Sequence, residues 1–445
     1  MLRAKSLERM ADATNVSDVM QDRASQHRTF FYGWRVVLTA GLGLALGYAP
    51  IIVYSLGIFL KPLTREFHSS RSNISLAFTL ANVAQALVSP QVGRWADRWG
   101  ARRVILVGTV LFGLLLTFSL LRSTSLWTLY LLFVLLGITG TGAAPVPYSK
   151  VVSNWFDRHR GLALGLTMVV FGAGVIVMPS LTQRLLTILG WRGAYATIGV
   201  IVLFVSVPLV ALVLKENPRE MGLLPDGEHT ARSAASERRN NEGIAWHDAR
   251  RDSVFWTIIA AFSLVGASVH GCVLHLAPML TDRGIPAGRA ALAASLLGSA
   301  VLIGRVASGY SLDRFFAPRV AIFFFCAAAV GMVLFWSGVA GSTAYVAAFL
   351  VGLGMGAEVD LIAFLTSRYF GLRAFGEIYG YAFGSYALAG ALGPWLMGMG
   401  FDRTGSYRAV LASFLVATLL AVVAVLRLGP YRYRALPSGQ FATPK

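Results

Sequence analysis

The sequence predicts an all-α membrane protein in which twelve transmembrane helices form two pseudo-symmetric halves of six. Three observations lead to this fold class: an apolar composition, roughly twelve runs long enough to cross a bilayer, and landmarks that recur at one spacing. Of 445 residues, 56% are hydrophobic and only 13% charged, with a mean hydropathy of +0.63. Soluble domains carry about 25% charged residues, so the composition excludes a soluble enzyme, a disordered chain and a coiled coil.

A helix needs about 20 mostly apolar residues to cross the hydrocarbon layer. Apolar runs bounded by charged or turn residues meet this length throughout the chain. In the first half, the expected spans lie near 33–60, 73–93, 102–121, 125–149, 160–184 and 193–214. In the second half, they lie near 253–278, 288–312, 319–338, 342–366, 374–400 and 407–427. The loops between them are short, so no separate soluble domain fits.

The spans divide the chain into an N-terminal half, 30–214, and a C-terminal half, 253–428, joined by a cytoplasmic linker at 215–252. Residues 1–29 are polar and lack the apolar core of a cleavable signal, so we expect a disordered cytoplasmic tail there. Residues 429–445 are expected to form a second cytoplasmic tail.

Basic residues outnumber acidic ones by 39 to 21, for a net charge of +18. With both termini in the cytoplasm, about 28 basic residues fall inside and about 10 outside, as the positive-inside rule expects. We therefore predict a multi-pass inner-membrane protein with cytoplasmic termini, whose basic residues contact anionic lipid and no nucleic acid. Cys272 and Cys326 show neither a disulfide framework nor metal-ligand spacing, so we expect no metal or cofactor.

The stretch that begins at Gly93 reads GRWADRWGARR, and 216 positions later Gly309 begins GYSLDR. Glycine lets helix backbones approach closely, and the aspartate can cap a neighbouring helix end while the arginines stay on the wet inner face. We expect this contact to hold one conformation shut; the alternative is a tight charged turn whose arginines only set topology. The candidate latch residues are Gly93, Asp97, Arg98, Arg102, Gly309, Asp313 and Arg314.

Other landmarks keep the same offset within a residue or two, which implies two parallel six-span repeats. Transporters built from such repeats place the substrate site at the interface between them. The matching landmarks are Trp155-Phe156 with Tyr369-Phe370, Gly161 with Gly376, Gly165 with Gly380, and Arg192 with Arg408.

The Gly-x-x-x-Asp-Arg-x-Gly-x-Arg-Arg pattern at 93–103 resembles the major facilitator superfamily, which carries it between the second and third helices. Further stretches are similar to the bacterial monocarboxylate transporter and oxalate–formate antiporter-like group. They are Phe31–Trp34, Asn154–Phe156 with Arg160–Gly165, His275–Pro278 with Thr281–Gly284, and Ser367–Gly371. The likeness covers essentially residues 30–430. It implies the major facilitator fold and transport of a small molecule by alternating access, without choosing the substrate.

Arg305 lies inside the span near 288–312, and its counterpart one repeat earlier is uncharged. An ionisable residue within a span is costly and marks a functional site, and a guanidinium stays charged and matches a carboxylate with its planar fork. The resemblance implies the same role, because monocarboxylate transporters place a substrate-binding arginine in the eighth helix. The alternatives are a permanent bridge to Glu358 or Asp360 and snorkelling to the inner interface.

Glu358 and Asp360 also lack charged repeat partners, and a carboxyl group desolvated in the bundle could carry a proton. Because they lie two residues apart on a helix, they point roughly 200° apart and are not expected to face one site. Their place in the inner half of the span favours a local charge network with Arg314 and Arg368 over proton coupling. His275 is a third candidate for proton coupling, although such a histidine more often hydrogen-bonds a carbonyl.

Four hydroxyl side chains in the spans are candidates for the substrate cavity, although aromatic residues in spans usually only pack. They are Tyr54, Tyr148, Ser385 and Tyr386. Two residues of the animal monocarboxylate transporters are missing: a lysine in the first helix and an aspartate one turn before the arginine, where Val301 stands. A single cavity cation fits a monoanion better than a dianion, and the usual proton-coupling pair is absent.

The sequence thus predicts a secondary transporter rather than an enzyme, which moves a small organic anion, most simply a monocarboxylate. The Gly-x-x-x-x-Gly-Lys-Ser/Thr motif does not occur, so a gradient of protons or of a counter-transported anion must drive it. One alternative is an exporter of drugs or amphipathic metabolites, with Arg305 neutralised by Glu358. Another is a receptor or intramembrane enzyme, for which the sequence offers no nucleophile–base or metal cluster.

Overall fold

The computed structural model describes residues 31–69, 71–119, 125–227, 243–338 and 342–433. Nearly all of this part of the chain is helical, and its one extended contact is an isolated bridge between Gly243 and Gly371. The predicted tail at 1–29 lies outside the described residues, as do 228–242 of the linker and 434–445 of the C-terminal tail. The all-α fold class is confirmed for the described residues.

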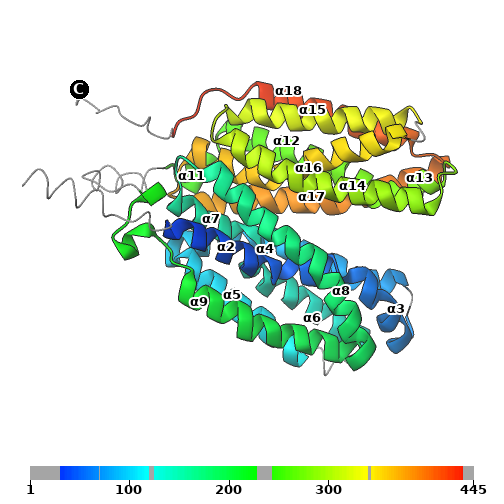
Figure 1. Ribbon diagram of the computed structural model, residues 1–445, viewed down its shortest axis with the longest axis horizontal. Helices are drawn as coiled ribbons and strands as arrows, with labels where there is room; N and C mark the ends of the chain where they lie inside the picture. Colours follow the sequence, from blue (N-terminus) through cyan, green and yellow to red (C-terminus); the bar gives the residue numbers. More distant parts are fainter. Residues whose placement is uncertain (1–30, 70, 120–124, 228–242, 339–341, 434–445) are drawn as a thin grey trace, which may run out of the picture.

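The N-terminal half contains six crossings, drawn from blue to green in Figure 1. They are α2 (Tyr32–Ala45) with η1 (Ala49–Val53) and α3 (Leu56–Glu66); α4 (Arg71–Trp99); α5 (Ala101–Leu114) with η2 (Leu115–Ser119); α6 (Leu126–Gly140) with η4 (Thr141–Ala143) and α7 (Pro145–Trp155); and α8 (Arg160–Ile201) with η5 (Val202–Ser206) and α9 (Val207–Val213). The last segment contains two crossings because it bends at Gly190, whose φ of +68° favours glycine.

The C-terminal half, drawn from green to red in Figure 1, contains the other six crossings of the described chain. They are α12 (Ser253–Leu274) with α13 (Leu276–Thr281), α14 (Ala287–Leu312), α15 (Ala317–Trp336), α16 (Ser342–Phe370), α17 (Phe375–Thr404) and α18 (Arg408–Leu426). The ends of these helices agree with the predicted spans to within about one turn. Pro318, the second residue of α15, suits a helix start because its missing N–H has no partner to lose there.

Nine helical segments in the described residues are long and apolar enough to cross a membrane. One of them, Arg160–Val213, holds two crossings, which gives ten. The remaining two, α4 and α17, have the length but are more polar. These two helices pack against each other at the contact between the halves, and polar residues of α4 such as Gln85 and Ser89 are buried.

The two halves lie side by side with their helices running in similar directions (Figure 1). Two helix pairs join them: α4 packs against α17, and α14 packs against α8. The offset of the repeat maps α4 onto α14 and α8 onto α17, so the two pairs are equivalent contacts. The interface therefore has the pseudo-symmetry that the sequence repeat predicts.

The linker between the halves is attached to both of them. On the N-terminal side, the Glu216 carboxylate accepts hydrogen bonds of 2.8 and 2.6 Å from the first two N–H groups of α5. On the C-terminal side, the N–H of Ile244 donates to the carbonyl of Phe370 over 3.0 Å. The short helix α11 (Trp246–Ala249) follows, and the ring of Trp246 stacks on Tyr381 of α17 with centroids 4.1 Å apart.

Candidate functional site

Two aspartates, one from each half, cap a helix of the other half. Asp97, near the end of α4, accepts hydrogen bonds of 2.9 Å from the N–H groups of Gly376 and Glu377 in the first turn of α17. Asp313, directly after α14, accepts bonds of 2.6 and 2.9 Å from two N–H groups in the first turn of α8. A helix N-terminus has unpaired N–H groups and a partial positive charge, so both carboxylates stabilise contact between the halves. We call the end of the bundle that these residues form the motif end.

The glycines of the repeated pattern allow this close approach. A Cβ atom added at Gly93 would lie 1.8 Å from the carbonyl oxygen of Gly376, and one at Gly309 would lie 2.7 Å from that of Gly161. At these distances an added Cβ atom would clash with the backbone of the opposite half. Any residue larger than glycine would therefore separate the halves at the motif end. Four of the predicted latch residues, Gly93, Asp97, Gly309 and Asp313, thus lie in the contact between the halves.

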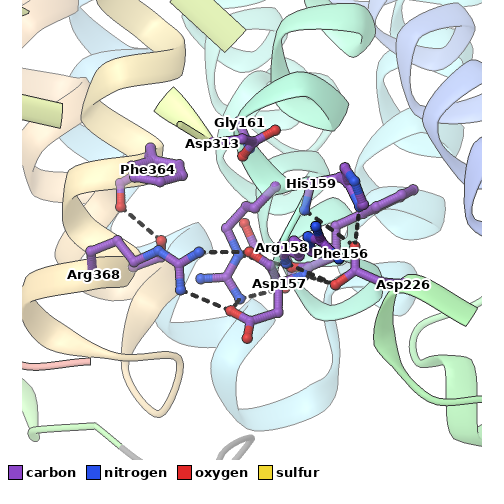
Figure 2. Close-up of polar contacts among 12 residues, drawn as sticks. Phe156, Asp157, Arg158, His159, Gly161, Asp226, Asp313, Phe364 and Arg368 are labelled. Carbon is purple, nitrogen blue, oxygen red and sulfur yellow. Dashed lines mark hydrogen bonds and ion pairs between the residues drawn. The ribbon is translucent and has the colours of Figure 1, made fainter. Parts of the chain in front are cut away.

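Two ion pairs across the halves, which the sequence reasoning missed, strengthen the motif end. Arg94 contacts the Glu377 carboxylate at 2.6 Å, and Arg368 of α16 contacts the Asp157 carboxylate at 2.8 Å (Figure 2). Within the N-terminal half, the Lys150 ammonium lies 2.6 Å from Asp97 and neutralises its charge. The sequence did hold a clue to the first pair. Arg94 directly follows Gly93 and Glu377 directly follows Gly376, and both glycines belong to the repeated landmarks.

The three arginines predicted for the latch lie outside the contact between the halves. Arg98 is exposed. Arg102 donates from its guanidinium to the carbonyl of Ala211 and stays within its own half. Arg314 is exposed and stacks over the ring of Tyr310, 3.5 Å from the ring centre. They remain at the wet surface, where the positive-inside rule places such residues.

The linker also organises the loop that carries Asp157. The Asp226 carboxylate accepts hydrogen bonds of 2.9, 2.7 and 3.2 Å from the consecutive N–H groups of Asp157, Arg158 and His159. Its Oδ1 also lies 3.2 Å from Nδ1 of His159. Figure 2 shows Asp226 on one side of this loop and Arg368 on the other. The linker therefore holds the loop in the shape that presents Asp157 to the C-terminal half.

Asp313 lies beyond the end of α14 and is largely shielded from water. Burial raises the pKa of its carboxyl from 3.8 to about 6, although its two backbone hydrogen bonds act in the opposite direction. The Asp313 contact can therefore respond to pH in the range around 6.

Arg305 lies in α14, at the contact with α8, and its side chain is 7% exposed. Its guanidinium carbon lies 5.7 Å from the ring centre of Phe171 in the other half. Its Nη1 is buried without a hydrogen-bond partner, and among the described residues no carboxylate lies within ion-pair distance. The structure thus shows neither the permanent bridge to Glu358 or Asp360 nor an exposed, snorkelling side chain.

Glu358 and Asp360 of α16 are 0% and 1% exposed. The hydroxyl of Tyr386 donates a 2.7 Å hydrogen bond to Glu358 Oε2. The other oxygen of Glu358 and both oxygens of Asp360 have no partner in the described structure. The charge of Arg305 acts on both carboxyl groups.

These positions correct one expectation. The predicted charge network is wrong, because Arg368 pairs with Asp157, and Arg314 lies over Tyr310. Glu358 and Asp360 are both buried because the C-terminal half of α16 is buried along most of its length.

Arg305 also acts electrostatically on three tyrosines: Tyr54, Tyr379 and Tyr386. Tyr54, at the end of η1, is 43% exposed, whereas Tyr386 is buried against Glu358. Two of the predicted cavity tyrosines are thus within the electrostatic influence of Arg305, as is Tyr379, which was not predicted. Tyr379 lies seven residues before Tyr386, so the two share one face of α17. This helical spacing could have indicated that Tyr379 lies near Tyr386.

The other predicted site residues lie elsewhere. Tyr148 is buried within the N-terminal half, with its hydroxyl directed at Gly43 of α2. Ser385 is half-buried on α17. His275 lies between α12 and α13, with its Nε2 at 3.0 Å from the carbonyl oxygen of Pro394. This contact agrees with the alternative in which His275 only hydrogen-bonds a carbonyl. The described residues contain no group of three His, Cys, Asp or Glu side chains that could hold a metal ion.

The sequence model described as Major Facilitator Superfamily matches residues 42–394. The chain belongs to the major facilitator superfamily. Monocarboxylate transporter 11 of Mus musculus is 29% identical over 414 residues, covering 91% of this chain and 88% of the relative. The uncharacterised MFS-type transporter YcxA of Bacillus subtilis (strain 168) is 24% identical, covering 85% and 90%. The predicted family membership is confirmed, and the chain is a multi-pass membrane transporter.

Solved transporters share its fold. The proton:xylose symporter XylE, bound to 6-bromo-6-deoxy-D-glucose, superposes with a TM-score of 0.71 at 16% identity, covering 90% of this chain and 97% of that one. The Escherichia coli fucose:proton symporter FucP gives 0.63 at 16% identity, covering 89% and 98%. At this identity the likeness concerns the fold alone, and it agrees with the predicted twelve-helix architecture.

Proposed function

We propose that this transporter moves a small organic anion with one carboxylate across the inner membrane, and that Arg305 binds the carboxylate. The observation that carries the proposal is the buried guanidinium of Arg305, which has an unpartnered nitrogen and no ion pair among the described residues. An uncompensated buried charge is costly, and a planar carboxylate is the ligand that a guanidinium fork matches best. The similarity to proteins named monocarboxylate transporters supports this substrate class.

Alternating access follows from the placement of the contacts. The caps of Asp97 and Asp313 join the halves at the motif end, while Arg305 lies farther along α14, about two turns from Asp313. A carrier that breaks these contacts and closes the opposite end would expose the Arg305 site to each side in turn. By the positive-inside rule, the motif end faces the cytoplasm.

The exporter alternative receives no support from the arrangement around Arg305. That alternative needs Glu358 to neutralise the guanidinium, whereas Glu358 is bonded to Tyr386 and forms no ion pair in the described structure. An uncompensated cation in the cavity would instead repel the cationic drugs that many exporters carry.

Uptake into proteoliposomes tests the proposal with a panel of labelled lactate, pyruvate, benzoate and phenylacetate. The wild type is expected to take up at least one of these acids. Arg305→Ala is expected to lower that flux about 30-fold or more, because truncating one partner of a buried charge pair costs about 2–5 kcal/mol. Thermal unfolding in detergent checks that the variant is folded.

Arg319→Ala is the matched control, because Arg319 is an exposed arginine in the first turn of the neighbouring helix α15. It is expected to transport at the wild-type rate. A folded Arg305→Ala protein that carries the acids as fast as the wild type would overturn the proposed substrate chemistry.

A further inference from the structure

We propose that residues 429–433, which follow α18, form a brace that positions Arg368 for its ion pair with Asp157 and so helps to hold the motif end closed. Tyr431 is the central positioning residue of this brace. The inference concerns the contact between the halves and does not depend on which solute is carried. It is carried by several contacts that fix the last turn of α16.

The sequence turns the chain across the motif end directly after α18. Gly429 and Pro430 follow the helix, and proline cannot continue a helix because it lacks an N–H group and its ring clashes with the preceding turn. In Figure 1 the described chain ends at the same end of the molecule as the linker helix α11. The first residues of the expected C-terminal tail therefore lie beside the helix ends of the C-terminal half.

The last turn of α16 obtains its missing hydrogen bonds from segments distant in sequence. The final carbonyl groups of a helix have no partner within it. The N–H of Tyr433 donates to the carbonyl of Arg368 over 3.0 Å, and the linker satisfies the carbonyl of Phe370 in the same way. The hydroxyl of Tyr369 donates to the carbonyl of Gly429 over 2.6 Å. The brace is therefore bonded to the arginine that reaches the other half and to its neighbour.

The ring of Tyr431 packs against α16 and the start of α15. Its centroid lies 5.5 Å from that of Tyr369 and 6.5 Å from that of Phe364, edge-on in both cases. Its hydroxyl accepts a hydrogen bond from the N–H of Ala317, the first residue of α15. The guanidinium carbon of Arg368 lies 5.1 Å from the centre of the Phe364 ring (Figure 2). Tyr431 thus supports the aromatic ring over which this guanidinium lies.

An ion pair connects the brace to α12 as well. The Arg432 guanidinium contacts the Asp252 carboxylate. This carboxylate also caps α12, because it accepts a 2.9 Å hydrogen bond from the N–H of Val254. The brace therefore contacts the starts of α12 and α15 and the end of α16, all of which belong to the C-terminal half.

Arg368 joins the C-terminal half to the loop that carries Asp157. Its guanidinium contacts the Asp157 carboxylate at 2.8 Å and donates to the Asp157 carbonyl over 2.6 Å, and its side chain is 7% exposed. A long side chain loses rotamer freedom in such a contact, and a group that is already held in the bound geometry loses less. Because the brace lies within one half, it can restrict the last turn of α16 before the halves meet, which favours the closed motif end.

Distances between spin labels at the opposite end of the bundle test the inference without any solute. Arg184→Cys in α8 and Asp402→Cys in α17 provide exposed label sites near the far ends of these helices, with Cys272 and Cys326 replaced by serine. In Tyr431→Ala we expect the ratio of closed to open motif end to fall about fivefold or more, because contacts that fix the last turn of α16 are lost. Opening there closes the opposite end and brings the labels together.

Two further variants show which part of the brace matters. Tyr431→Phe keeps the ring and is expected to stay within about twofold of wild type. Tyr433→Ala is the matched control and should behave like wild type, because Tyr433 bonds to α16 through its backbone N–H, which alanine retains. Thermal unfolding in detergent checks that each variant is folded. An unchanged distance distribution in folded Tyr431→Ala, or an equal shift in Tyr433→Ala, would overturn the inference.

A double-mutant cycle tests whether Tyr431 acts through Arg368. Arg368→Met removes the guanidinium, keeps an unbranched side chain and is expected to open the motif end by itself. In that background, Tyr431→Ala should change the ratio less than about twofold, because residues that act through one contact are not additive. If the two effects multiply in full, Tyr431 only stabilises the fold and the inference fails.

A milder variant covers the case in which Tyr431→Ala does not fold. Tyr369→Phe removes the hydrogen bond to Gly429 and keeps the buried ring. We expect it to lower the ratio of closed to open motif end about twofold or more. A distance distribution equal to that of the wild type would count against the brace.

Discussion

The charged side chains described here differ in whether they have a partner. At the motif end, Arg94 pairs with Glu377 across the two halves. Farther from this end, Arg305 and Asp360 are buried, and within the described part of the chain neither of them has an ion pair or a side-chain hydrogen bond. Buried polar groups in proteins are nearly always satisfied, so unsatisfied charges mark places where a ligand or proton completes the structure.

Arg305→Lys tests whether the fork of the guanidinium matters or only its charge. We expect kcat/KM for the transported acid to fall about 10- to 100-fold, because a point charge replaces a bidentate contact and loses a charge-assisted hydrogen bond worth about 1.5–3 kcal/mol. Initial rates of labelled-acid uptake over a range of concentrations give this ratio. A lysine variant with the wild-type ratio would indicate that a positive charge alone suffices.

At this scale the sequence predicts some residues better than others. Arg305 could be identified because a lone arginine inside a span stands out, and Tyr54 and Tyr386 do lie in its field. Tyr148 was misplaced, because hydropathy does not tell whether a tyrosine in a span faces the cavity or the core of its own half. The environment of Asp360 depends on helices distant in sequence and could not be read from the chain.

At the scale of whole helices, the two caps are the main contacts that hold the motif end together. Each joins a carboxylate at the end of one helix to the N-terminus of a helix in the other half. The sequence predicted the aspartates and their capping role from the repeated pattern. It could not predict which helix each one caps, because Asp97 and Gly376 lie 279 residues apart.

Asp313→Ala is expected to open the motif end. Loss of a helix cap costs about 1 kcal/mol, which shifts the closed-to-open ratio about fivefold. Distances between spin labels at Arg98→Cys and Arg319→Cys, with Cys272 and Cys326 replaced by serine, measure this ratio. Arg314→Ala is the control, since Arg314 stays within its own half; an unchanged distance distribution in Asp313→Ala would argue against the cap as a latch.

The same contact is expected to depend on pH, with a defined sign. The carboxyl of Asp313 has its pKa raised from 3.8 to about 6 by burial in the closed contact, so that contact binds the proton more tightly than the open form does. The part of its stabilisation that depends on this proton is complete below pH 3.8 and is lost as the pH rises through about 6, while the two backbone hydrogen bonds to the carboxyl group remain. The spin-label distances should therefore show more closed protein at about pH 5 than at about pH 7, and Asp313→Asn should remove the difference.

At the scale of the whole molecule, symmetry and asymmetry separate by role. The aspartate caps and glycine contacts of the motif end occur in both halves, whereas Arg305, Glu358 and Asp360 occur in one half only. The sequence predicts the number of spans, the repeat and the position of the linker because these are written in local hydropathy and spacing. It does not predict how the linker attaches, because single residues such as Asp226 make that contact without a pattern.

Asp226→Ala tests the linker attachment. Three consecutive N–H groups lose their acceptor, at a cost of about 1–3 kcal/mol, so amide hydrogens of residues 157–159 should exchange about fivefold faster or more. Mass spectrometry of the peptide that covers this loop measures the change. Asp248→Ala is the control, because the Asp248 side chain is an exposed linker carboxylate, 65% accessible. Equal exchange in both variants would contradict the proposed bracing of Asp157.

The polarity of α4 has a consequence for how the protein is made. Its buried polar residues, such as Ser89, lie against Gly380 and neighbouring backbone of α17, a helix that leaves the ribosome about 280 residues later. At about 5–20 residues per second, α4 waits about 15 to 55 s for that partner. During this interval, α4 must be shielded from lipid in another way. The shield is either a neighbour that is made before α17, such as α6, or the insertion machinery.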